Sequence, residues 1–175
     1  ALEREDQVTA ILDTLSASSS DYMQFHGAWL DQLLSEGRYT EFEEHAAALD
    51  SLHSSSSVLT LLRTRKALEL GESLDTKIWL ELQTEPSDLA TFYRALLLKQ
   101  NGYIGPADSL FKSLLHSPEG DIAVQAYLER LKGLRKTDPA SATNQLEKFM
   151  EDPRFRRGDT HFLLGEFKMA DGEYL

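Results

Sequence analysis

Apolar residues recur along this chain with the spacing of a buried helical stripe. The segment 8–15 has apolar residues at positions i, i+3, i+4 and i+7, and the segments 89–97 and 107–115 repeat this pattern. Such spacing follows the 3.6-residue period of an amphipathic α-helix. The sequence has no sustained alternation of apolar and polar residues, and no Asn-Gly or Asp-Gly pair lies between β-branched runs. Strand signals are therefore missing, and the pattern predicts an all-α protein.

Start signals divide this pattern into about ten helices. Ser117-Pro118-Glu119 and Asp138-Pro139 each place a capping side chain before a proline at the first helical position. The serine-rich segments 16–20 and 54–57 are expected to be turns or loops, with phosphorylation as the alternative. Because the links are mostly short, neighbouring helices should be antiparallel. The expected helices begin near residues 3, 21, 39, 57, 74, 87, 106, 118, 139 and 157.

Glycines that we expect to end helices recur at intervals of 34, 31, 31 and 39 residues. They are Gly37, Gly71, Gly102, Gly133 and Gly172. The segments 33–42, 96–107 and 168–175 each run from an apolar or basic helix end through a glycine to an aromatic residue. Self-similarity with a period of this length is typical of repeat architectures. The sequence therefore predicts a repeated pair of helices.

This pattern resembles the tetratricopeptide repeat family, whose unit of roughly 34 residues is a pair of antiparallel helices with small residues at their crossing. Leu164-Gly165, Gly172 and Tyr174 match the first half of the family pattern. A fuller match is formed by Ala95, Gly102, Ile104, Ala107 and Phe111. The resemblance implies an all-α fold, a right-handed α-solenoid of antiparallel helix pairs, and a single superhelical domain over residues 1–175.

The closing segment 162–175 has the pattern of the first helix and turn of a repeat, without a second helix. We expect the chain to be a piece of a longer protein, or the last helix to cap the array itself. If the second helix is missing, an exposed apolar surface would favour the pairing of two copies through the C-terminal helix.

The charge and composition narrow the class of partner. The formal net charge is −11, which opposes binding to nucleic acid or to an anionic membrane, because phosphate groups demand clustered Lys and Arg. No apolar run approaches the ~18–20 residues of a membrane span, so we expect no membrane insertion. Charged residues make up 27% of the chain and hydrophobic residues 41%, as in soluble proteins of the cytoplasm or periplasm. Without cysteine, no disulfide or thiolate chemistry is available.

Motifs of catalytic, cofactor and metal sites are missing from the sequence. It has no HExxH, CxxC, DxDxDG, GxSxG or GxxxxGK[ST] motif, so we expect no catalytic residue, no cofactor and no metal. Glu41 and His45 share one helical face and could form half a metal site, but a solvated helix surface is favoured. GYIGPA (102–107) is expected to be an interhelix turn, since no strand precedes it. RFRR (154–157) is either an anion site or a loop with local salt bridges.

The resemblance also implies which residues face a partner. The family uses side chains three residues before and one after the small-residue site in the first helix of each pair. Transferred to this chain, the candidate groove residues are Leu61, Arg65, Phe92, Leu96, Tyr127 and Phe162, accompanied by Gly27, Asp31, Ala123 and Glu166. The Lys/Asn/Arg clamp with which some members hold a C-terminal carboxylate is missing. The mostly apolar candidate groove residues suit an apolar partner segment, either a helix or an extended peptide. Alternatively, these residues pack against neighbouring helices. Trp29 and Trp79 are expected to be core residues, with exposed anchors as the alternative.

These observations predict a non-catalytic scaffold that binds a protein or peptide segment in an apolar groove. Two alternatives remain open at this point. One is the helical accessory part of a larger enzyme, such as a lytic transglycosylase. The other is a chaperone for secretion or assembly.

Overall fold

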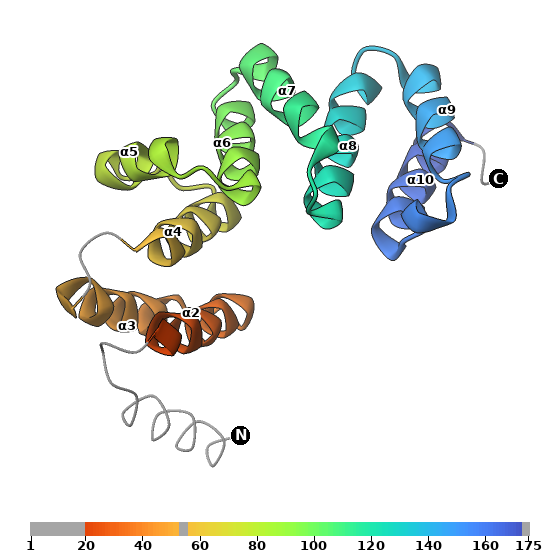
Figure 1. Ribbon diagram of the computed structural model, residues 1–175. Helices are drawn as coiled ribbons and strands as arrows, with labels where there is room; N and C mark the ends of the chain where they lie inside the picture. Colours follow the sequence, from red (N-terminus) through yellow and green to blue (C-terminus); the bar gives the residue numbers. More distant parts are fainter. Residues whose placement is uncertain (1–19, 53–55, 173–175) are drawn as a thin grey trace. The chain divides into compact units, whose positions relative to one another are not determined.

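Every regular element in the described part of the chain is helical (Figure 1). The computed structural model describes residues 20–52 and 56–172. Over these residues it has nine α-helices, two short 3₁₀ helices and no strand, which confirms the all-α prediction. The helix expected near residue 3 lies outside the described residues. Each of the nine helices begins within two residues of a start that the sequence predicted.

The chain divides into two compact units, with the boundary between Glu85 and Pro86. The first unit contains α2 (Ser20–Ser35), α3 (Tyr39–Leu52), α4 (Ser57–Leu70) and α5 (Thr76–Thr84). The second unit contains α6 (Asp88–Gln100), α7 (Ile104–Ser113), η1 (Leu114–His116), α8 (Gly120–Arg135), α9 (Pro139–Phe149), η2 (Pro153–Phe155) and α10 (Gly158–Ala170).

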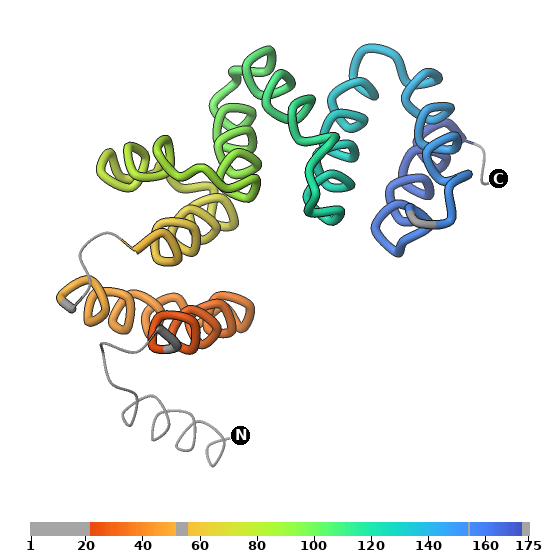
Figure 2. The backbone as a smooth tube through the Cα atoms, in the orientation of Figure 1, coloured from red at the N-terminus to blue at the C-terminus, as the bar shows by residue number. Residues whose placement is uncertain are grey.

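Within each unit, helices that follow one another in sequence pack together. In the first unit α2 contacts α3, and α4 contacts α5. In the second unit α6 contacts α7, α7 contacts α8, α8 contacts α9, and α9 contacts α10. Figure 2 traces the short connections between these helices. None of the helices in the described ranges combines the length and the apolar character needed to cross a membrane.

Local capping explains where several helices begin. The Asp138 side chain accepts a hydrogen bond from the Ser141 backbone N–H at 3.0 Å, with Pro139 at the first helical position of α9. The start expected at Pro118 is two residues early, because α8 begins at Gly120. Ser117 instead stabilises the turn ahead of α8, where its hydroxyl accepts a hydrogen bond from the Glu119 backbone N–H at 3.0 Å.

Four of the five glycines end helices as expected, because they adopt the left-handed conformation that side chains disfavour. Their φ angles lie between 66° and 84°, at Gly37, Gly71, Gly102 and Gly172. The prediction for Gly133 is wrong. It lies inside α8, which continues to Arg135. The glycine spacing therefore does not give the end of α8.

Among the described residues, the apolar stripes form one core cluster in the first unit and two in the second. In the first unit, buried residues of α2, α3 and α4 meet around Phe42 and Leu30. In the second unit, Ala107 and Phe111 are buried among residues of α6 and α8. A further cluster joins α8, α9 and α10. Because α8 contributes to both clusters, it is the central helix of the second unit.

Candidate partner-binding surface

Alternate helices of the first unit, α2 and α4, contact each other. Asp31 of α2 pairs with Arg65 of α4, 34 residues later. Gly27 of α2 faces Val58 of α4 so closely that an added Cβ would lie 2.7 Å from the valine Cγ1. Arg65 also donates to Glu69 at 2.7 Å, and Leu61 beside it is half-buried. The candidate residues Leu61 and Arg65 therefore lie on a helix that is held against its neighbour, with the arginine charge neutralised by carboxylates.

Alternate helices of the second unit are joined in the same way. The Gln125 side-chain amide in α8 donates to the Asp159 carboxylate in α10 at 2.8 Å, again 34 residues later. Arg157, at the start of α10, pairs with Asp121 of α8. Lys99 of α6 pairs with Glu129 of α8 at 2.6 Å. These contacts join α8 to α10 and α6 to α8.

A cleft of about 380 Å³ opens between α8 and α10. Its side-chain lining consists largely of pairs of residues that stand 34 apart in sequence, one on α8 and one on α10 or at its start. Phe162 is 69% exposed and Leu128 beside it is buried. We call this feature the α8–α10 cleft; the paired lining residues are Gln125 and Asp159, Leu128 and Phe162, and Lys132 and Glu166.

Tyr127 lies at a different site from Phe162. It lines a pocket of about 460 Å³ formed mainly by α7 and α8, which we call the α7–α8 pocket. The Tyr127 ring stacks on Phe149 with 4.1 Å between ring centroids, and its hydroxyl donates to the Gln145 carbonyl at 3.3 Å. Burial raises the pKa of this hydroxyl above its ordinary value. Charges in the lining pair with each other, as when Arg130 binds Asp108 at 2.7 Å.

Phe92 and Leu96 pack against a core cluster. Both are half-buried beside the cluster that contains Phe111, and the Phe92 ring meets Phe111 edge to face at 5.7 Å. Neither residue lines the α8–α10 cleft or the α7–α8 pocket. The structure therefore brings one of the six candidate groove residues, Phe162, to the α8–α10 cleft and places the others elsewhere.

Two further parts of this surface were not among the candidate groove residues. Leu128 and Lys132 line the cleft, and their signal was the 34-residue distance to Phe162 and Glu166. Met169 is 64% exposed on α10. It stands seven residues after Phe162, so the two share one side of the helix.

The residues considered for a metal or anion site are engaged in other contacts. Glu41 accepts from Arg38 at 2.8 Å, and this hydrogen bond lowers the pKa of its carboxyl. His45 Nε2 lies 2.7 Å from His26 Nδ1 on α2. Within residues 20–52 and 56–172, no group of three potential metal ligands occurs. In the segment 154–157, Arg156 donates to the Met150 carbonyl at 2.8 Å, which favours the loop with local contacts.

The two tryptophans are both half-buried. Trp29 packs against the core cluster of the first unit, and the guanidinium of Arg38 lies 5.7 Å from its ring centroid. This agrees with the core role expected for Trp29. Trp79 lies within α5.

The net negative charge is concentrated in one unit. Residues 1–85 contain sixteen acidic and six basic residues, a net charge of −10. Residues 86–175 contain thirteen acidic and twelve basic residues, a net charge of −1. The α8–α10 cleft therefore belongs to the nearly neutral unit.

Comparison with known proteins gave no match. No protein-family profile, no curated protein and no solved structure is significantly similar to the chain.

Proposed function

We propose that this chain is a non-catalytic interaction scaffold, built as a tetratricopeptide-like α-solenoid, which binds a partner segment at the α8–α10 cleft. The observation that carries the proposal is the position of Phe162. It is a large aromatic side chain, 69% exposed, at the wall of a cleft. Phe167 of the same helix is buried in the core, so α10 has an apolar side for the fold and a second one toward solvent.

A partner that covers the exposed Phe162 ring would gain free energy from removing this apolar surface from water. Covering apolar surface contributes about 25 cal/mol per Å² removed from water. Aromatic side chains that fill pockets are typical of the few residues that dominate the affinity of an interface. Phe162 has this character, with Leu128 as the floor of the cleft and polar residues at its rim.

Selection of peptides from a random phage library against the whole chain tests the proposal. We expect enriched peptides whose affinity, measured by fluorescence anisotropy, falls about thirtyfold or more when Phe162→Ala removes the ring, since truncation of a hot spot costs roughly 2 kcal/mol or more. Phe25→Ala is the matched control, because Phe25 is 49% exposed on α2 of the other unit.

The control variant should bind the selected peptides like the parent. Failure to enrich any peptide, or equal affinity for the parent and Phe162→Ala, would contradict a binding role for this cleft.

A further inference from the structure

The charged residues of the α8–α10 cleft differ in whether another side chain neutralises them. Lys132 pairs with Glu129 at 2.7 Å. Asp159 accepts from Gln125 at 2.8 Å and lies 3.3 Å from Arg157. Glu166 is exposed and has no ion-pair or hydrogen-bond partner within the described ranges 20–52 and 56–172. The cleft therefore has one carboxylate whose charge a partner can neutralise.

Glu166 lies between two exposed apolar side chains on the same side of α10. Phe162 precedes it by four residues and Met169 follows it by three, and both are mostly exposed, at 69% and 64%. In a helix, positions i, i+4 and i+7 form one stripe. The outer face of α10 thus presents the order apolar, acidic, apolar over about 10 Å of helix.

A helical partner matches this spacing better than an extended one. A second helix has the same rise per residue, so its positions i, i+4 and i+7 can face the three side chains in turn. In an extended chain, residues on one face are about 6.8 Å apart, and no pair of them spans about 10 Å. Gly165 also leaves room on α10, because a Cβ there would have no neighbour within 4 Å.

We propose that the α8–α10 cleft, together with the exposed side of α10 that carries Met169, binds an amphipathic helix of a partner protein whose contacting stripe has a Lys or Arg between two large apolar residues. This inference rests on the proposed function and names the partner chemistry for the same site. The apolar residues cover Phe162 and Met169, and the cation pairs with the Glu166 carboxylate.

Labelled 15-residue peptides in a helical Ala/Gln host provide the probes. The first has leucine at its fourth and eleventh positions and lysine at its eighth. The second has glutamate in place of the lysine, and the third keeps the lysine but has serine in place of both leucines. A fourth is the first peptide with a proline at its seventh position, which breaks the helix.

We expect the leucine–lysine peptide to bind the whole chain at least tenfold more tightly than each of the other three in fluorescence anisotropy. The gap between the lysine and glutamate peptides should narrow from 50 to 500 mM salt, because salt screens exposed charges. Glu166→Lys should reverse this preference. Glu119→Lys is the matched control, since it makes the same charge change at an exposed residue ahead of α8, and it should leave the preference in place.

Equal affinity for the lysine and glutamate peptides, or equal effects of Glu166→Lys and Glu119→Lys, would overturn the assignment of a basic partner. Equal affinity for the proline peptide would overturn the helical partner. In either case the proposed function stands if Phe162→Ala still weakens the binding of the phage-selected peptides. The chain alone is also examined by sedimentation. If it forms a dimer and Phe162→Ala dissociates that dimer, a second copy of the chain occupies the cleft, and the inference is overturned.

Discussion

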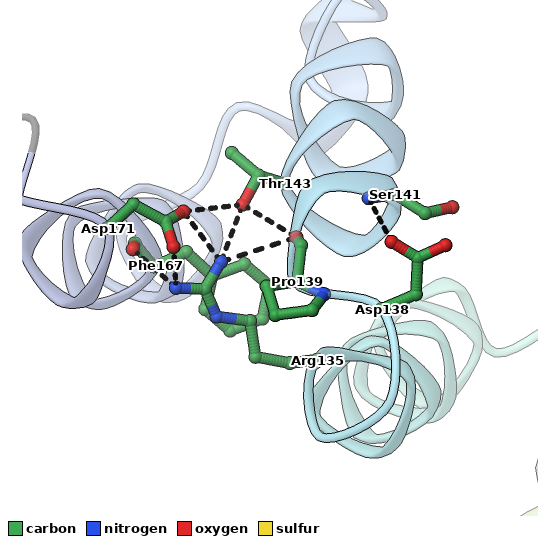
Figure 3. Close-up of polar contacts among 7 residues, drawn as sticks. All are labelled: Arg135, Asp138, Pro139, Ser141, Thr143, Phe167 and Asp171. Atoms are coloured by element: carbon green, nitrogen blue, oxygen red, sulfur yellow. Dashed lines mark hydrogen bonds and ion pairs between the residues drawn. The ribbon is translucent and has the colours of Figure 1, made fainter.

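Arg135 shows how much of the second unit depends on one side chain (Figure 3). Its guanidinium donates to the Thr143 hydroxyl at 2.9 Å, to the Phe167 carbonyl at 2.9 Å and to the Asp171 carboxylate at 2.7 Å. It also lies over the Phe167 ring, 4.8 Å from the centroid. One residue at the end of α8 therefore binds both α9 and the end of α10.

Replacement of Arg135 by lysine keeps the charge and removes the planar fork of donors. We expect Arg135→Lys to lower the free energy of unfolding by about 1–3 kcal/mol, because several hydrogen bonds from a charged group are lost. Urea unfolding followed by circular dichroism measures this change. Arg130→Lys is the control, since its pair with Asp108 is more exposed; if both variants lost equal stability, Arg135 would not have this linking role.

The Glu129 carboxyl gives the second unit an acid-sensitive contact. Burial opposes its ionisation, but hydrogen bonds from Lys132 and Lys99 outweigh burial and hold its pKa below the ordinary value of 4.5. A pKa that is lower in the folded state stabilises the fold above the unfolded value, and this contribution is lost as the pH falls through the folded value.

We therefore expect Glu129→Gln to lower the melting temperature at pH 7 and to have a progressively smaller effect below about pH 4.5. Thermal unfolding of both proteins between pH 3 and pH 7 measures the difference. A gap in melting temperature that stays constant down to pH 3 would show that the ionised carboxylate does not contribute in this way.

At the scale of elements, two helical glycines have opposite surroundings. An alanine at Gly27 would meet Val58 of α4 at 2.7 Å, whereas an alanine at Gly165 of α10 would meet nothing within 4 Å. Neither glycine has a positive φ. The difference between them therefore lies in packing between helices.

Gly27→Ala should lower the free energy of unfolding by about 1–3 kcal/mol, because α2 and α4 must move apart. Gly165→Ala should raise it by about 0.5–1 kcal/mol, because alanine favours the helix over glycine. Chemical denaturation of the two single variants and the parent provides the test. Destabilisation by Gly165→Ala would mean that another segment approaches α10 at this point.

The helices themselves were predictable from sequence because their signals are local. Caps such as Asp138 and left-handed glycines such as Gly37 act within a few residues. The α8 register was not predictable from the glycine spacing, since Gly133 is helical and nothing in its neighbours marks that. Phe162 was identified because Leu164-Gly165 sets the register of α10, while Leu128 required knowledge of how α8 packs against it.

At the scale of the whole molecule, the second unit has the means to fold by itself. It contains two core clusters, both formed entirely by residues from 86 onward. Residues 86–175 produced alone should show a helical circular dichroism spectrum and a cooperative melting transition. They should also retain the affinity of the whole chain for selected peptides, whereas residues 1–85 should not bind them. Absence of a cooperative transition in 86–175 would show that its stability depends on the preceding residues.

The central claim is that a partner segment binds at the α8–α10 cleft, and a map of the bound surface tests it most directly. The measurement is the change in backbone amide chemical shifts of the isotope-labelled chain when a phage-selected peptide is added. We expect the largest changes along α8 and α10, around Leu128, Lys132, Phe162, Glu166 and Met169. Changes concentrated around Tyr127 and Ile104 in the α7–α8 pocket, or in the first unit, would contradict the claim.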